Sequence, residues 1–153
     1  MATEIERKFL VKRFDGIVDQ GSHLKQGYLS TDPERTVRVR LVDETGYITI
    51  KGLTVSCSRP EFEYTIPADE ANEMLDRLCQ KPLIEKMRYK VSVEDVVFEI
   101  DRFLGENEGL IIAEVELSDE NQRVPRPDWL GEEVTDDPRY FNANLVKHPY
   151  ARW

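Results

Sequence analysis

The sequence has few residues of the kinds that build zinc, redox or disulfide sites. Its 153 residues include only two cysteines, Cys57 and Cys79, and two histidines, His23 and His148. Their spacing fits no zinc motif and gives no catalytic Cys-His pair. Two lone cysteines also provide no disulfide framework, so we expect reduced thiols in a cytoplasmic protein.

Long apolar runs and an excess of basic residues are missing as well. No run of about 18 apolar residues occurs, so we expect no membrane span. The first residues, Met1-Ala2-Thr3-Glu4, are acidic, so we expect no signal peptide. The net charge of −9 lacks the basic footprint of general nucleic-acid binding. An anionic ligand therefore requires basic residues that are gathered in one place.

Charged residues at every second position are the main feature of the chain. Glu4-Ile5-Glu6-Arg7-Lys8 is the first case. A β-strand sends successive side chains to opposite faces, so Glu4, Glu6 and Lys8 share one face. The same alternation recurs at Arg38 and Arg40, Lys51, Arg59, Glu61 and Glu63, Lys86 and Arg88, Glu99 and Asp101, and Glu114 and Glu116. The intervening positions are mostly apolar, so nearly every strand has one ionic face.

The pattern predicts a single domain over residues 1–153 that is mainly antiparallel β (α+β). Strands are expected near 3–12, 23–31, 35–43, 46–52, 58–67, 82–93, 96–104 and 110–118. Turn signals such as Asp15-Gly16 separate them. Helices are expected at 68–80 and around 138–147. The acidic, Pro-rich segment 119–137 is expected to pack over the strands through Trp129 and Leu130.

Eight antiparallel strands with alternating faces favour a closed barrel. Like charges at positions i and i+2 destabilise a sheet unless something neutralises them. Bound metal would neutralise the acids and bound anion the bases, so we expect the ionic face to line the lumen. The apolar outer face would then be covered by the two helices, by the segment 119–137 and, in a homodimer, by a partner subunit. An open sheet with a solvated ionic face is the structural alternative.

The ordered set of charged pairs, beginning with Glu4-x-Glu6-x-Lys8, resembles the CYTH superfamily, the triphosphate tunnel metalloenzymes. The resemblance runs from Glu4 to Leu145, and the tail Gly131-Glu132-Glu133-Val134-Thr135 is similar to that of the short bacterial members. It implies a tunnel of eight antiparallel strands with a few helices packed outside. It also implies cleavage or cyclisation of triphosphate compounds with a divalent metal.

The residue types suit triphosphate chemistry, in which catalysis is mostly positioning and charge stabilisation. Arg and Lys bind phosphate oxygens, and the candidates are Lys8, Arg38, Arg40, Lys51, Arg59, Lys86 and Arg88. Carboxylates suit Mg²⁺ or Mn²⁺, of which we expect two ions. The resemblance favours Glu4, Glu6, Glu114 and Glu116 as metal ligands, followed by Glu61, Glu63 and Asp101. The catalytic set is then Glu4, Glu6, Lys8, Glu114 and Glu116.

For some residues the sequence leaves two interpretations open. Arg59 faces either the lumen or the surface. Tyr140 and Asn142 either close one tunnel end or only anchor a helix. Arg7 and Glu85 fall on the opposite strand face and are expected to lie outside the lumen.

Three functions are compatible with the sequence. Hydrolysis of inorganic tripolyphosphate to pyrophosphate and phosphate is favoured, because the short chain has no evident insert for base recognition. A class IV adenylate cyclase or a nucleoside or thiamine triphosphatase would need an aromatic platform, and Tyr140 is the only aromatic candidate at the tunnel mouth. A non-catalytic binder of polyphosphate or nucleotide would need only the basic residues.

Overall fold

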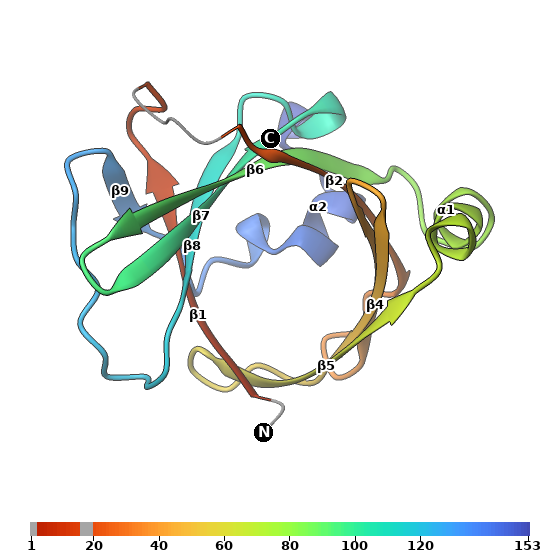
Figure 1. Cartoon of the computed structure of the whole chain (residues 1–153), viewed down its shortest axis with the longest axis horizontal. Helices are drawn as coiled ribbons and strands as arrows, with labels where there is room; N and C mark the ends of the chain where they lie inside the picture. The colour runs from red at the N-terminus through yellow and green to blue at the C-terminus, as the bar shows by residue number, and fades with distance from the viewer. Residues whose placement is uncertain (1–2, 16–19) are drawn as a thin grey trace.

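The computed structural model describes residues 3–15 and 20–153, and the chain folds into an antiparallel barrel (Figure 1). Gly16 of the predicted turn at Asp15-Gly16 lies outside the described residues. The strands are β1 (Thr3–Val11), β2 (Ser22–Ser30), β3 (Thr36–Val42), β4 (Thr45–Lys51), β5 (Ser58–Ile66), β6 (Ile84–Val93), β7 (Val96–Phe103), β8 (Ile111–Glu116) and β9 (Leu130–Glu133).

Eight of these strands close the barrel. They follow the order β5-β4-β3-β2-β6-β7-β8-β1, and β1 pairs back onto β5. Glu4 is opposite Arg59 in this closing pair. The eight predicted strands are confirmed within one or two residues at each end, and the alternative of an open sheet is wrong.

The strand β9 was not predicted. It pairs antiparallel with β1, where Phe9 is opposite Glu133 and Val11 is opposite Leu130. The pairing of β1 with β5 ends at Ile5, so β9 takes the same edge of β1 further along the strand. A segment of four residues after a Pro-rich stretch is too short to show a clear alternation.

The outer face is covered in two places. Helix α1 (Ala68–Arg77) packs Ala71 and Leu75 against Val39 of β3. On the other side, Trp129 and Leu130 pack with Phe98, and the Trp129 and Phe98 ring centroids are 5.2 Å apart. The predicted packing of the segment 119–137 through these two residues is therefore confirmed.

Part of the outer face of β4 and β5 stays uncovered in the single chain. Ile50 and Phe62 are opposite each other there and are 39% and 45% exposed. Neither helix of the described residues is long and apolar enough to cross a membrane.

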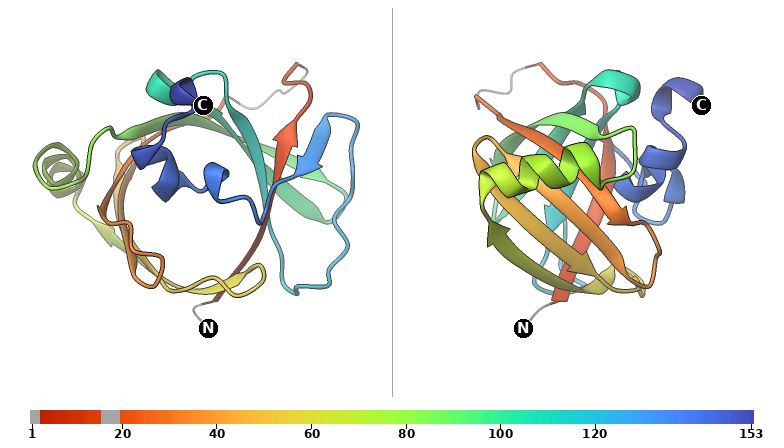
Figure 2. Two further views of the ribbon diagram at one scale, coloured as in Figure 1. Left: turned by 180° about the vertical axis from the view of Figure 1, so that it is seen from behind. Right: turned by 90° about the vertical axis from the view of Figure 1, so that its right-hand side faces the viewer.

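Helix α2 (Asn142–Lys147) lies across one end of the barrel, instead of covering its outer face (Figure 2). Its Leu145 and Val146 join a buried cluster with Ile84 and Phe103. These two strand residues are in phase with the lumen-facing positions of β6 and β7, so the lumen face is apolar at this end. Burial of that apolar surface accounts for the position of α2.

Three short 3₁₀ helices complete the described structure: Gly105–Asn107, Pro138–Tyr140 and Tyr150–Arg152. Tyr140 is buried in the same cluster as α2, and its ring centroid lies 5.1 Å from that of Trp153. Of its two interpretations, the structure supports the anchoring one.

Candidate active site

Two cavities meet inside the barrel. One, of about 360 Å³, includes Glu99 and Glu116 in its wall. The other, of about 570 Å³, extends toward α2 and includes Lys8 and Phe141. Both cavities are lined by Glu4, Glu6, Arg38, Arg40, Lys51 and Glu114. The charged faces of the strands therefore line one continuous lumen.

Most of the predicted site residues line this lumen. They are Glu4, Glu6, Lys8, Arg38, Arg40, Lys51, Arg59, Glu61, Glu63, Arg88, Glu114 and Glu116. Lys86 and Asp101 belong to neither cavity wall and are fully buried behind it. Arg7 and Glu85 lie outside as predicted, since Arg7 pairs with Glu133 at 3.0 Å and Glu85 with His23 at 2.8 Å.

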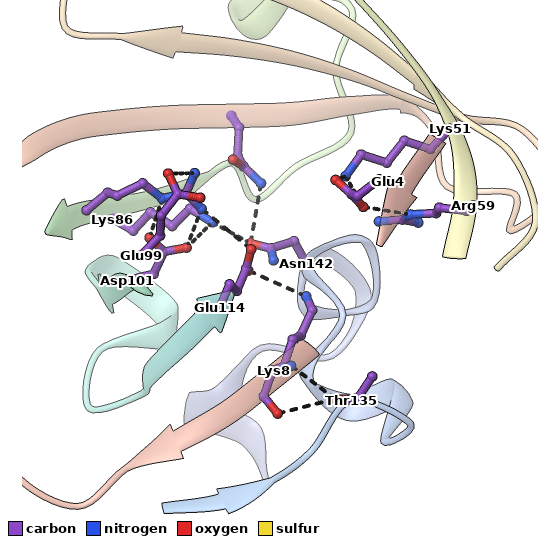
Figure 3. A network of polar contacts seen from close by, with 12 residues as sticks. Glu4, Lys8, Lys51, Arg59, Lys86, Glu99, Asp101, Glu114, Thr135 and Asn142 are labelled. Atoms are coloured by element: carbon purple, nitrogen blue, oxygen red, sulfur yellow. Dashed lines mark hydrogen bonds and ion pairs between the residues drawn. The ribbon is translucent and has the colours of Figure 1, made fainter. Parts of the chain in front are cut away.

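Glu4 forms the first ionic centre of the lumen. Figure 3 shows Lys51 and Arg59 turned toward its carboxylate, with the Lys51 Nζ at 2.9 Å and the Arg59 Nε at 3.3 Å. Burial alone would raise the pKa of Glu4, but the Lys51 ammonium and Arg59 lower this pKa to about 2. Arg59 is thus a lumen residue, and Glu4 is held ionised.

Asp101 forms a second centre. Its carboxylate accepts two hydrogen bonds from Arg88, at 2.7 and 2.8 Å, and lies 2.8 Å from the Lys86 Nζ. Burial opposes ionisation, yet Lys86 and Arg88 lower the pKa of Asp101. Because Asp101 and Lys86 satisfy each other behind the wall, this geometry gives no support to the predicted metal ligand Asp101 or the predicted phosphate contact Lys86.

The acids of β1 and β8 form a third centre that has fewer cations for each carboxylate. Glu114 lies 3.6 Å from the Lys8 Nζ and 3.8 Å from Arg88. Glu6 is opposite Glu116 in the strand pairing. Burial, together with the negative charges of Glu114 and Glu4, raises the pKa of Glu6 to about 8. Burial and the charges of Glu4 and Glu99 also raise the pKa of Glu116.

The basic wall of the lumen lies on β3. Arg38 donates to the Thr49 hydroxyl at 3.2 Å, and its Nε is buried with no hydrogen-bond partner among the described residues. Burial and the charges of Arg38 and Arg88 lower the pKa of Arg40 to about 9. Crowded, desolvated guanidinium groups of this kind favour a bound anion.

Two neutral residues of the site were missed in the sequence. Gln26 and Thr49 are fully buried, and both hydrogen-bond to the arginines of β3, with the Arg40 Nε 2.9 Å from the Gln26 Oε1. Aromatic lining was also missed, because Tyr28 and Phe141 line the cavity near α2. Gln26 and Tyr28 are two residues apart on β2 and therefore share one strand face, which is the sequence signal that could have identified both as lumen residues.

The residue types of the lumen fit a divalent metal. Within residues 3–15 and 20–153, no three Asp, Glu, His or Cys side chains are already arranged as a metal site. Burial and neighbouring carboxylates nevertheless raise the pKa values of Glu6 and Glu116, beside Glu114, whose pKa Lys8 and Arg88 lower. Carboxylates in such a place suit Mg²⁺ or Mn²⁺.

Comparisons with known proteins agree with this geometry. A relative named inorganic triphosphatase from Acetivibrio thermocellus is 53% identical over 155 residues, covering 100% of this chain and 99% of the relative. A second protein of that name, from Nitrosomonas europaea, is 39% identical over 148 residues, covering 94% and 97%. A crystal structure of an inorganic triphosphatase superposes with a TM-score of 0.68 at 36% identity, covering 93% of this chain and 96% of that one.

The family assignment rests on the whole length of the fold. The family model described as the CYTH domain matches residues 2–150. That match includes every strand of the barrel and the helix α2 at its end. The chain therefore belongs to the CYTH domain family.

Proposed function

We propose that this protein hydrolyses tripolyphosphate to pyrophosphate and phosphate and that it depends on Mg²⁺ or Mn²⁺. The observation that carries the proposal is the lumen itself, in which acidic and basic side chains from almost every strand line two joined cavities. The two relatives named inorganic triphosphatase support the same activity.

The basic residues hold the substrate. Arg38 and Arg40 provide guanidinium groups, which bind phosphate oxygens through two parallel hydrogen bonds. Lys8, Lys51, Arg59 and Arg88 supply further positive charge around the same space. Binding the anion would relieve the repulsion that lowers the pKa of Arg40. Phosphoryl transfer needs mainly this kind of positioning and charge stabilisation.

The acidic residues would hold the metal. Glu4, Glu6, Glu114 and Glu116 are the proposed ligands, and Glu61 and Glu63 lie on the same cavity wall. When bound, a divalent cation neutralises phosphate charge and lowers the pKa of a water molecule. Glu6, whose pKa is about 8, would give up its proton as a cation replaces it. The presence of acids beside the bases is the reason to prefer an enzyme over a simple anion binder.

A nucleoside triphosphatase is the second candidate. Phe141 and Tyr28 line the cavity near α2 and Tyr47 lines the other cavity, so aromatic surface does exist in the lumen. The Lys8 Nζ, however, lies 5.8 Å from the centroid of the Phe141 ring. The Phe141 ring therefore already faces the Lys8 ammonium, and we rank tripolyphosphate ahead of nucleoside triphosphates as the substrate.

Product analysis by phosphorus NMR tests the proposal. Tripolyphosphate incubated with the protein and Mg²⁺ or Mn²⁺ should give equimolar pyrophosphate and orthophosphate. Glu6→Gln, assayed under the same conditions, should leave the substrate intact. Unchanged tripolyphosphate with the wild-type protein under both metals would contradict the proposed activity.

A further inference from the structure

Two amide side chains join the basic wall of the lumen to helix α2. The Arg40 Nε donates to the Gln26 Oε1 at 2.9 Å. The Gln26 Nε2 donates to the Asn142 Oδ1 at 3.3 Å, and the Lys86 Nζ donates to the same Oδ1 at 3.0 Å. Asn142 is the first residue of α2, and Figure 3 shows it directed toward the lumen network.

The two cations fix the direction of every bond in this chain. Arg and Lys side chains donate hydrogen bonds and accept none. Arg40 must therefore meet the oxygen of Gln26, which leaves the Gln26 nitrogen to find an acceptor. Lys86, which also pairs with Asp101, can meet Asn142 only through its oxygen, and that oxygen serves both donors. A single arrangement of the two amides satisfies both cations.

Burial makes this arrangement costly to lose. Gln26 and Lys86 are both fully buried, so an amide left without a partner there would not reach bulk water, and Lys86 would keep only its ion pair with Asp101. Arg40 and Lys86 also repel each other, since Arg40 is among the charges that lower the pKa of Lys86. The two amides separate these cations and supply each of them with an acceptor.

The hydrogen bond that Arg40 donates to Gln26 fixes the guanidinium and leaves its outer edge available. It uses the Nε of Arg40, the guanidinium nitrogen closest to the backbone, and so leaves the outer edge of the group for other partners. Arg40 lines both cavities. A long arginine without this bond would sample many rotamers, and ordering it would weaken substrate binding.

We propose that Gln26 and Asn142 are positioning residues for substrate binding: Gln26 aligns the Arg40 guanidinium for the phosphate chain, and Asn142 sets the orientation of the Gln26 amide from α2. This inference rests on the proposed triphosphatase activity. It also gives α2 a role in substrate binding, in addition to the packing of Leu145 and Val146.

A double-mutant cycle tests the inference. Gln26→Met keeps the length of the side chain and removes both amide groups. We expect it to raise the KM for tripolyphosphate about tenfold or more, in line with the loss of a hydrogen bond to a charged group, with a smaller change in kcat. Arg40→Lys keeps the positive charge but has carbon where Nε was. In the Arg40→Lys protein, Gln26→Met should change KM by less than about twofold.

Additional variants separate positioning from folding. Gln80→Met makes the same substitution at an exposed position and should leave KM unchanged. Asn142→Leu, which removes the shared acceptor, should also raise KM. Circular dichroism and Tm identify any variant that is not folded at the assay temperature.

The outcomes distinguish this inference from the proposed function. Absence of hydrolysis by the wild-type protein would remove the function and the inference together. Hydrolysis by the wild type, with Gln26→Met having equal effects in the wild-type and Arg40→Lys backgrounds, would overturn the inference alone. An unchanged KM in folded Asn142→Leu would overturn it as well.

Discussion

Glu6 and Glu116 are opposite each other in the antiparallel pairing of β1 with β8, and both line the lumen. Two acids in such a position repel each other and destabilise the strand pair unless they are protonated or bound to a cation. The first of these is favoured at Glu6, because burial and the charges of Glu114 and Glu4 raise its pKa to about 8. Binding of a metal would provide the second.

Divalent metal should therefore stabilise the fold. A cation that binds the native acids and not the unfolded chain raises the free energy of unfolding by mass action. We expect Mg²⁺ or Mn²⁺ to raise the Tm measured by calorimetry, with a smaller rise in the Glu6→Gln, Glu116→Gln double variant. An equal rise in both proteins would place the stabilising cation elsewhere.

The stability of the metal-free protein should fall as the pH rises from about 5 to 7. The native pKa of Glu6 is about 8 and its ordinary value is 4.5, so the folded protein retains a proton that the unfolded chain releases. Its contribution is complete below the ordinary pKa and is lost as the pH rises toward the folded one. The low pKa of Glu4, about 2, acts below this window, and Lys86, whose pKa burial lowers to about 7, opposes the loss only at its upper end.

Glu6→Gln provides the control for this pH dependence, because the amide imitates the protonated acid. Urea unfolding at pH 5 and pH 7, in the presence of chelator, should show a smaller loss of stability in the variant than in the wild type. Equal losses in the two proteins would assign the effect to other groups, such as Glu61 and Glu116, whose pKa values are also raised by burial.

The two kinds of lumen residue should differ in kinetics. Glu116→Gln should mainly lower kcat for tripolyphosphate, because a proposed metal ligand is lost. Arg40→Ala should also raise KM, since phosphate charge is left without a partner. Arg7→Ala, which breaks an outer ion pair with Glu133, should change kcat/KM less than about twofold. If Arg7→Ala were as damaging as Glu116→Gln, the chemistry would not lie inside the barrel.

The buried pair Asp101 and Lys86 should matter more for stability than the partly exposed Glu63. Asp101→Asn leaves Lys86 and Arg88 without their carboxylate, and breaking a buried ion pair costs about 3–5 kcal/mol. Glu63→Gln removes a charge from a side chain that is 42% exposed and should cost less than about 1 kcal/mol. Urea unfolding of both variants without metal measures the difference. If Asp101→Asn unfolded with the same free energy as the wild type, the Asp101 carboxylate would not stabilise the fold.

The barrel and the faces of its strands could be predicted from sequence, because period-two alternation assigns each side chain to one face. Glu4, Glu6 and Lys8 are examples. Alternation does not show, however, how deeply a side chain on the lumen face is buried. Asp101 and Lys86 are in phase with the lumen residues and yet lie behind the cavity wall, because each satisfies the other's charge.

The alternation of charged residues could not predict the uncharged residues of the site or the contacts between residues far apart in the sequence. Gln26 shares the lumen face but carries no charge, so its contact with Arg40 was not predicted. The place of α2 depends on apolar residues such as Ile84 and Phe103, which are 19 residues apart and meet only in the folded barrel. The amphipathic pattern of a helix of six residues cannot show which surface it will cover.

The central claim is that a metal-dependent lumen recognises the triphosphate chain itself. The most direct measurement is kcat/KM for tripolyphosphate and for ATP, determined under one Mg²⁺ or Mn²⁺ concentration and repeated in excess chelator, with cyclic AMP quantified among the products. The account predicts a higher kcat/KM for tripolyphosphate, no cyclic AMP in quantity and no turnover in chelator. A higher kcat/KM for ATP, cyclic AMP as the main product, or activity that survives chelation would contradict it.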